Sequence, residues 1–207
     1  MTLTPIRAVA FDAFDTLVQI RQPLRPLSIL QTWMRATLAE PRLDDYEWLM
    51  TRDFDLAALF PDLPTQTIDH INSAIALEAA SIAAFDDALP TLSELRDRGY
   101  KTALCSNILT PYAAPTLAAL PVPWDAITWS FKARAAKPNP MIYADLIRTL
   151  DVRPDEILFV GDHIENDVTA PRRAGMRALY LRRGYQPLAP DREIATLGTL
   201  LTLLPEM

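Results

Sequence analysis

Short apolar runs that end abruptly in polar residues recur along this chain. Five of them are Arg7–Phe11, Lys101–Cys105, Ala126–Trp129, Ile157–Val160 and Arg177–Leu181. Their apolar character is continuous rather than alternating, which is typical of strands buried on both faces of a parallel sheet. Helical segments lie between the runs, for example where Leu89, Leu92 and Leu95 recur before Gly99. This alternation predicts an α/β fold with a Rossmann-like parallel sheet.

Two of the predicted helices begin with a recognisable pair of residues. In Thr110-Pro111 and in Asn139-Pro140, a residue with a hydrogen-bonding side chain precedes a proline. Such a side chain is favoured at the N-cap and proline at the first helical position. We therefore predict Thr110 and Asn139 as N-caps.

The stretch from about Gln19 to Ala84 departs from this pattern. It contains helical-looking segments, Leu27–Leu38, Asp44–Phe60 and Thr67–Ala83, and no convincing strand. An all-helical insert after the first strand would lie over the carboxyl edge of the sheet, where ligands of such sheets bind. We expect its aromatic side chains to form its own core; they are Trp33, Trp48, Phe54 and Phe60. The predicted division is an α/β core of residues 1–18 and 85–207 and a helical cap of residues 19–84.

Composition and charge narrow the possible functions. Half of the 207 residues are hydrophobic, and the formal net charge is −6 with no local cluster of Lys and Arg. This disfavours a nucleic-acid partner, which normally requires a basic surface. No apolar run is long enough to cross a bilayer, so we expect no membrane partner and a cytoplasmic location. A single cysteine, Cys105, excludes an intramolecular disulfide, and two histidines disfavour a multi-histidine zinc site.

Polar residues follow several of the predicted strands. Asp12 follows the first run, Ser106 the second, and Asp162 the fourth, with Asp167 five residues later. Lys137 precedes a proline, which places it at the rim of a loop. Each residue alone is more often structural than functional. These residues occur in this order at strand ends and in a loop beside the same edge of the predicted sheet. Together they predict a functional site.

These residues resemble, in order, the four motifs of the haloacid dehalogenase-like hydrolases. The likeness extends along the whole chain and includes a helical cap between the first and second motifs. It implies that Asp12 attacks a phosphoryl group and forms an aspartyl-phosphate, which water then hydrolyses. It also implies a small phosphorylated metabolite as substrate; the sequence does not indicate an oligomeric state.

The resemblance also assigns roles to individual residues. Asp12, Lys137 and Ser106 would be catalytic. Substrate would contact Ser106, Asn107, Lys137 and Thr16. Mg²⁺, which favours oxygen ligands, would be held by the carboxylates of Asp12, Asp162 and Asp167 and by the backbone carbonyl of Phe14.

The first motif departs from the pattern of the phosphatases in this family. These usually carry a general-acid aspartate two residues after the nucleophile, where this chain has Phe14, and Asp15 stands where a glycine is usual. The run from Asp12 to Thr16 looks more like that of the 2-haloacid dehalogenases, which need neither the acid nor a metal. We expect the side chain of Asp15 to point away from that of Phe14, because adjacent residues of an extended backbone face opposite ways.

The fourth motif favours the phosphatases. Asp162 and Asp167 resemble the magnesium-binding version, and clustered acids are costly to keep without a cation. We therefore predict a magnesium-dependent phosphatase. Without a general acid it would prefer activated leaving groups, such as acyl phosphates. Two alternatives stay open: a metal-independent 2-haloacid dehalogenase, and a weakly active regulator that binds a phosphorylated ligand.

Overall fold

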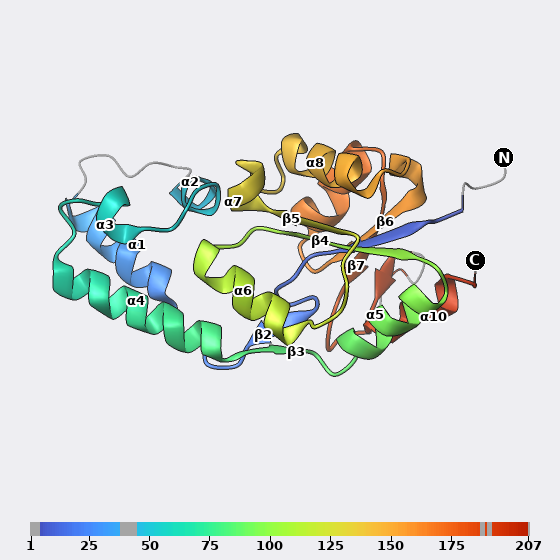
Figure 1. Cartoon of the computed structure of the whole chain (residues 1–207), viewed down its shortest axis with the longest axis horizontal. Helices are drawn as coiled ribbons and strands as arrows, with labels where there is room; N and C mark the ends of the chain where they lie inside the picture. Colours follow the sequence, from blue (N-terminus) through green and yellow to red (C-terminus); the bar gives the residue numbers. More distant parts are fainter. Residues whose placement is uncertain (1–4, 38–44, 187–188, 190–191, 207) are drawn as a thin grey trace.

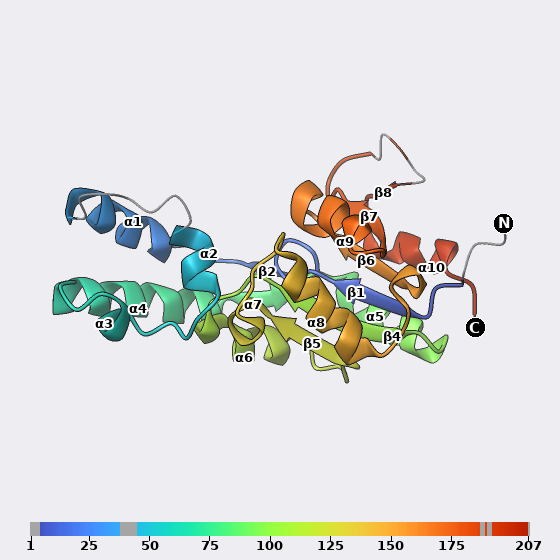
Figure 2. The same cartoon turned by 90° about the horizontal axis from the view of Figure 1, so that it is seen from above.

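A six-stranded parallel sheet forms the centre of the computed structural model, which describes residues 5–37, 45–186, 189 and 192–206. The strand order is β5-β4-β1-β6-β7-β8, and Figures 1 and 2 together label these strands. The strands are β1 (Ala8–Phe11), β4 (Lys101–Ser106), β5 (Ala126–Trp129), β6 (Ile157–Gly161), β7 (Arg177–Leu181) and β8 (Glu193–Ile194). The α/β fold and the five predicted strands are confirmed, with bounds that differ by one residue at most. The two-residue strand β8 was not predicted, because two residues are too few to carry a pattern.

Helices cover both faces of the sheet, and the central strand β1 divides its side chains between them. Val9 and Phe11 belong to one hydrophobic cluster, whereas Ala8 and Ala10 belong to the other. The first cluster includes α5 (Ala88–Asp97) and α10 (Leu200–Leu203), and the second includes α8 (Pro140–Leu150) and α9 (Ala170–Arg173). Burial on both faces is the reason that the strands read as continuous apolar runs.

The insert between β1 and β4 is mainly helical. Its helices are α1 (Pro26–Thr37), α2 (Asp45–Met50), α3 (Leu56–Leu59) and α4 (Thr65–Ala80). They lie together beyond the sheet, on the side to which the carboxyl ends of β1 and β4 point (Figures 1 and 2). The longest described helix, α4, has 16 residues. No helix in the described part of the chain has the length and the apolar character needed to cross a membrane.

Two details of the predicted insert were wrong. The segment Asp44–Phe60 is divided into α2 and α3, because Asp55 accepts hydrogen bonds from the backbone of Ala57 and Ala58 and so begins a new helix. The insert also contains strand residues: β2 (Val18–Ile20) pairs antiparallel with β3 (Ile82–Ala84). These strands are too short for a sequence signal, and their alanines also suit a helix. The predicted helix ends Leu38 and Asp44 lie outside the described residues.

The ribbon of β2 and β3 closes the two ends of the insert on each other. Beyond the pairing of Val18 with Ala84, Phe85 donates to the carbonyl of Leu17 at 2.9 Å. The insert thus leaves and rejoins the sheet domain at one place.

The two predicted N-caps have different outcomes. Asn139 caps α8 and accepts from the backbone N–H of Met141 at 3.0 Å, as predicted. Thr110 is not the N-cap of α6 (Thr110–Ala119), because Leu109 holds that position. The hydroxyl of Thr110 instead accepts from the backbone N–H of Phe54, at 3.3 Å, in the insert.

Candidate active site

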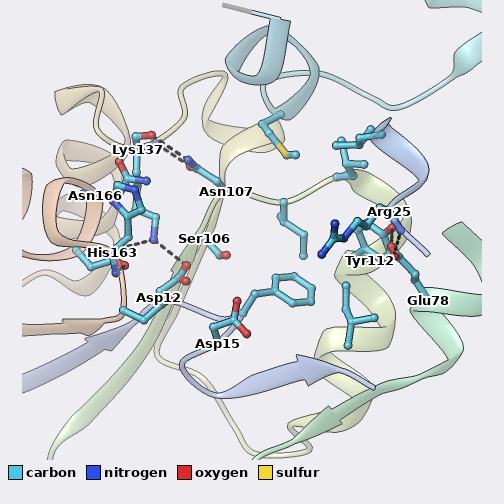
Figure 3. A pocket seen from close by; sticks show the side chains of 18 of the residues that line it. Asp12, Asp15, Arg25, Glu78, Ser106, Asn107, Tyr112, Lys137, His163 and Asn166 are labelled. Carbon is cyan, nitrogen blue, oxygen red and sulfur yellow. Dashed lines mark hydrogen bonds and ion pairs between the residues drawn. The ribbon is translucent and has the colours of Figure 1, made fainter. Parts of the chain in front are cut away.

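The topology of the sheet brings the predicted site residues together. Strand β1 lies between β4 and β6, so their carboxyl ends place Asp12, Ser106 and Asp162 side by side. A cavity of about 380 Å³ opens there, between the strand ends and the insert (Figure 3). Seven of the eight predicted site residues line it, and the exception is Thr16.

Lys137 connects two of the carboxylates. Its Nζ lies 2.7 Å from Oδ1 of Asp12 and 2.7 Å from Oδ1 of Asp167. Burial lowers the pKa of Lys137, but the charges of Asp12 and Asp167 outweigh burial, so that the pKa lies above its ordinary value. The buried lysine therefore stays charged and holds both acids in place.

Asn107 fixes the backbone that carries this lysine. Its Oδ1 accepts from the backbone N–H of Lys137 at 2.7 Å, and its Nδ2 donates to the Lys137 carbonyl at 2.9 Å. Asn107 was predicted from the sequence to contact the substrate. The geometry shows that its side chain positions Lys137, and its predicted contact with substrate stays a prediction.

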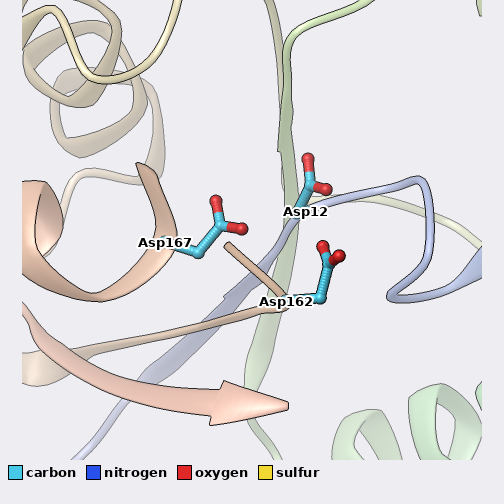
Figure 4. A group of neighbouring side chains, drawn as sticks. All are labelled: Asp12, Asp162 and Asp167. Atoms are coloured by element: carbon cyan, nitrogen blue, oxygen red, sulfur yellow. The ribbon is translucent and has the colours of Figure 1, made fainter. Parts of the chain in front are cut away.

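Three carboxylates meet beside Lys137. Ligand atoms of Asp12, Asp162 and Asp167 lie within 4.8 Å of one another (Figure 4). Burial raises the pKa of Asp162 to about 7, with further contributions from the charges of Asp12 and Asp167. One ammonium facing three acids leaves an excess of negative charge. The donor set of oxygen atoms and this excess both fit a divalent cation such as Mg²⁺.

Asp167 reaches the cluster from an unusual turn. It belongs to the π-helical segment η2 (Ile164–Thr169), a type of turn that is often found at functional sites. Its Oδ2 accepts from the backbone N–H of His163 at 2.9 Å. Burial raises the pKa of Asp167, and the ammonium of Lys137 opposes that effect.

Phe14 presents an apolar surface where an acid was expected from the family pattern. Its ring packs edge-to-face against Tyr112, with centroids 6.1 Å apart, and lines the cavity. In the described part of the chain no hydrogen bond uses its carbonyl oxygen. The carbonyl is thus available to a metal, and that ligand role stays a prediction.

The expected orientation of Asp15 was wrong. Its φ of 56° is left-handed, so the backbone turns here instead of staying extended, and Asp15 lines the same cavity as Phe14. Aspartate tolerates this conformation better than most residues with a side chain. Burial and the charge of Asp12 raise the pKa of Asp15, while Arg183 lowers it.

Ser106 lines the cavity, whereas Thr16 does not. Ser106 is buried at the end of β4 and lines the cavity, and its hydroxyl has no partner among the described residues. Thr16 is fully buried outside the lining and donates to Oδ1 of Asp162 at 3.4 Å. Its predicted contact with substrate stays a prediction.

The far wall of the cavity was not predicted from the sequence. It includes Arg25 and Glu78 of the insert and Tyr112 of α6. No pattern in the sequence marks them, since an arginine before a proline and a glutamate within a helix are ordinary. Of the four aromatic residues predicted to form the core of the insert, Phe60 packs against Trp33 and Trp48 at centroid distances of 6.0 and 5.8 Å. Phe54 is partly buried against the large hydrophobic cluster.

The sequence of this chain is similar to those of several known proteins. A family model described as haloacid dehalogenase-like hydrolase matches residues 6–175. The glyceraldehyde 3-phosphate phosphatase of Methanopyrus kandleri is 32% identical over 54% of this chain. This match spans about half of the relative, 49% of its length. The (S)-2-haloacid dehalogenase 1 of a Pseudomonas species is 26% identical over 98% of both chains.

Solved structures share its fold. A HAD phosphatase from Thermococcus onnurineus superposes with a TM-score of 0.70 at 26% identity, over 97% of this chain and 99% of its own. The L-2-haloacid dehalogenase from Xanthobacter autotrophicus with chloropropionic acid covalently bound has a TM-score of 0.66 at 22% identity, over 96% and 98%. At that identity the likeness concerns the fold alone.

Proposed function

This chain belongs to the haloacid dehalogenase-like hydrolases, and from that membership we propose that it is a magnesium-dependent phosphatase for a small phosphorylated metabolite. The observation that carries the proposal is the group of three carboxylates, Asp12, Asp162 and Asp167, around a single ammonium. A dehalogenase that works without a metal has no need of this excess negative charge. Residues 19–84 would form the helical cap over a core of residues 1–18 and 85–207.

The metal ligands would be the three carboxylates and the carbonyl oxygen of Phe14. When bound there, Mg²⁺ would supply positive charge that neutralises the phosphoryl oxygens and the attacking carboxylate. The raised pKa of Asp162 supports this assignment, because a cation would replace the proton that the metal-free cluster retains near neutral pH.

The protein's own residues would carry out the two chemical steps. A carboxylate oxygen of Asp12 forms a bond to phosphorus while the bond from phosphorus to the leaving oxygen breaks, and solvent protonates the leaving group. Lys137 and the hydroxyl of Ser106 bind the phosphoryl oxygens as charge shifts onto them. Water then attacks the aspartyl-phosphate at phosphorus, which releases inorganic phosphate and restores the carboxylate of Asp12.

Phe14 limits the leaving groups in this proposal. A general acid typically contributes about 10²–10⁴-fold to such reactions, and a phenyl ring cannot donate a proton. Acyl phosphates and phosphoanhydrides leave readily without one. We therefore propose that activated phosphates are turned over faster than simple alkyl phosphates.

A second candidate function rests on the same residue. A 2-haloacid dehalogenase would use Asp12 to attack the carbon that carries the halogen, with release of halide and no general acid. Phe14 and the similarity to a Pseudomonas dehalogenase along the whole chain favour it. The acidic cluster around Lys137 favours the phosphatase.

The deciding experiment measures phosphate release from acetyl phosphate, p-nitrophenyl phosphate and a sugar phosphate, each with Mg²⁺ and with EDTA. The variants are Asp12→Asn and a matched control, Asp97→Asn, at an exposed position on α5. We expect release that requires Mg²⁺, is fastest with acetyl phosphate, disappears in Asp12→Asn and persists in Asp97→Asn.

The other outcomes identify the alternatives. Halide release from 2-chloropropionate in EDTA, lost in Asp12→Asn, would make the protein a dehalogenase. Tight binding of phosphate esters without turnover of any substrate would make it a regulator that binds a phosphorylated ligand.

A further inference from the structure

Arg25 extends from the insert into the cavity that contains Asp12. Figure 3 draws it across the cavity from Asp12 and Lys137, with its guanidinium directed inward. Within the described part of the chain this guanidinium has neither a hydrogen-bond nor an ion-pair partner. A guanidinium offers several N–H donors in a planar fork that matches a carboxylate or phosphate with two parallel hydrogen bonds.

The backbone at Arg25 is held in place by a buried glutamate. Oε1 of Glu78 accepts from the backbone N–H groups of Leu24 and Arg25, at 2.6 and 2.8 Å. Oε2 accepts from the hydroxyl of Tyr112. The φ of Arg25 is 53°, a left-handed conformation that disfavours residues with a side chain. Glu78 thus compensates for an unfavourable backbone that directs the arginine toward the cavity.

The start of α1 adds to the positive potential at this wall. Its first residues, Pro26 to Ser28, line the cavity beside Arg25. The N-terminus of a helix of this length, 12 residues, favours an anion. Glu78 is the other charged group of the insert on the lining, and its oxygens are already occupied by three donors.

Apolar side chains also line the cavity between its polar groups. They include the side chains of Phe14, Leu27 and Ile108. A ligand that fills the cavity would therefore have a phosphoryl group at Asp12, a short hydrocarbon part, and a second negative group at Arg25.

We infer that Arg25 binds a carboxylate at the end of the substrate opposite the phosphoryl group, so that the substrates are small phosphorylated carboxylic acids. This inference rests on the proposed phosphatase function. Arg25 selects the substrate, and Glu78 is a positioning residue that acts through Arg25. The planar fork of the guanidinium is the reason to prefer a carboxylate over a neutral polar group.

The test compares phosphonates with and without a carboxylate as inhibitors of acetyl phosphate hydrolysis. Phosphonoacetate is paired with methylphosphonate, and 3-phosphonopropionate with ethylphosphonate. In the unchanged protein we expect the carboxylate to strengthen inhibition by about 10- to 100-fold in at least one pair, as for a charge-assisted hydrogen bond. In Arg25→Gln the two members of each pair should inhibit about equally. Because both constants come from the same variant, any shared loss of activity cancels from their ratio.

Two further variants sharpen the result. Arg21→Gln removes the same charge from the same segment, but Arg21 does not line the cavity. This variant should therefore keep the preference for the carboxylate. Arg25→Lys keeps the positive charge but lacks the planar fork of N–H donors. This variant should keep only part of the preference for the carboxylate. A preference that survives in Arg25→Gln, or that is absent from the unchanged protein, would overturn the inference. Stronger, Arg25-dependent inhibition by methylenediphosphonate than by phosphonoacetate would assign the site to a second phosphate instead.

Failure of the proposed function is distinguishable from failure of this inference. If none of acetyl phosphate, p-nitrophenyl phosphate and the sugar phosphate is hydrolysed, the phosphatase proposal fails. Calorimetric binding of the same phosphonate pairs, with Mg²⁺ present, still determines whether Arg25 discriminates for the carboxylate, because it requires no turnover.

Discussion

Asp167 fills the space that a side chain at Gly161 would need. An ideal Cβ placed on Gly161 would lie 2.4 Å from Cγ of Asp167, closer than real Cβ contacts come. Gly161 ends β6, and Asp167 folds back over it within η2 to reach Lys137. The position requires glycine because two parts of the site approach closely there.

Gly161→Ala should therefore damage the site more than the fold. The added methyl group must displace Asp167 from Lys137, at an overpacking cost of about 1–3 kcal/mol in the free energy of unfolding. We expect at least about a tenfold rise in the Mg²⁺ concentration that half-saturates phosphate release, equal to about 1.4 kcal/mol. Gly198→Ala is the control, since the nearest atom to its added Cβ is 3.9 Å away. An unchanged magnesium requirement in Gly161→Ala would contradict the role given to Asp167.

Phe14→Asp should restore a general acid to the site. Its side chain would replace the ring that now packs against Tyr112. We expect hydrolysis of an alkyl phosphate to rise relative to that of acetyl phosphate, by up to about 10²–10⁴-fold if the new acid is well placed. The measurement is kcat/KM for both substrates. Phe14→Asn, which has the same shape but no acid proton, should show no such rise. Equal gains from Asp and Asn would mean that removal of the ring, not the acid, is responsible.

The sheet and the residues at its edge were largely predictable, whereas the wall that faces them was not. Asp12, Ser106 and Asp162 could be placed because each lies at the end of an apolar run, and parallel strands bring their carboxyl ends together. The direction of the Asp15 side chain was predicted wrongly because it depends on a left-handed φ, which the surrounding sequence does not indicate. Local runs of apolar residues indicate where the strands lie. The direction of a side chain just after a strand depends on a single backbone angle.

Arg25 and Glu78 are separated by more than fifty residues along the chain, and tertiary structure alone brings them together. The short strands β2 and β3 were missed for a related reason, since their pairing joins the two ends of the insert. Contacts between such distant segments leave no periodic pattern in the sequence, so the sequence alone does not predict them.

Asp162 should contribute less to the stability of the metal-free protein as the pH rises from about 4 to about 7. Burial, with Asp12 and Asp167, raises the pKa of Asp162 from 3.8 to about 7. Its carboxyl group therefore holds its proton more tightly in the folded chain than in the unfolded chain. Across this window the folded state binds more protons, so this group lowers the free energy of unfolding as the pH increases.

Urea unfolding in EDTA at pH 5, 6, 7 and 8 tests this sign. The stability of the unchanged protein relative to Asp162→Asn should fall with pH, because the variant lacks the titrating group. Since Mg²⁺ must replace the same proton, the stabilisation it gives should grow over this range. A relative stability that is constant or rises with pH would contradict the proton-binding behaviour assigned to Asp162.

Glu78→Ala should loosen the attachment of the insert to the wall of the cavity. It removes the acceptor for the backbone N–H groups of Leu24 and Arg25 and for the hydroxyl of Tyr112. Leaving buried donors unpaired costs about 1–3 kcal/mol each, but Leu24 and Arg25 are exposed, so water can replace part of the loss. We expect a total loss of about 1–3 kcal/mol in the free energy of unfolding.

Glu78→Gln separates the acceptor from the charge. Its amide oxygen can still accept from both backbone N–H groups, and its amide nitrogen can donate to the oxygen of Tyr112. This variant should therefore retain most of the stability, and it should keep the preference for phosphonates with a carboxylate. Glu78→Ala should lose that preference, because Arg25 is no longer held toward the cavity. If Gln and Ala reduce stability equally, the negative charge of Glu78 matters more than its hydrogen bonds, and its part in positioning Arg25 would have to be explained by electrostatics.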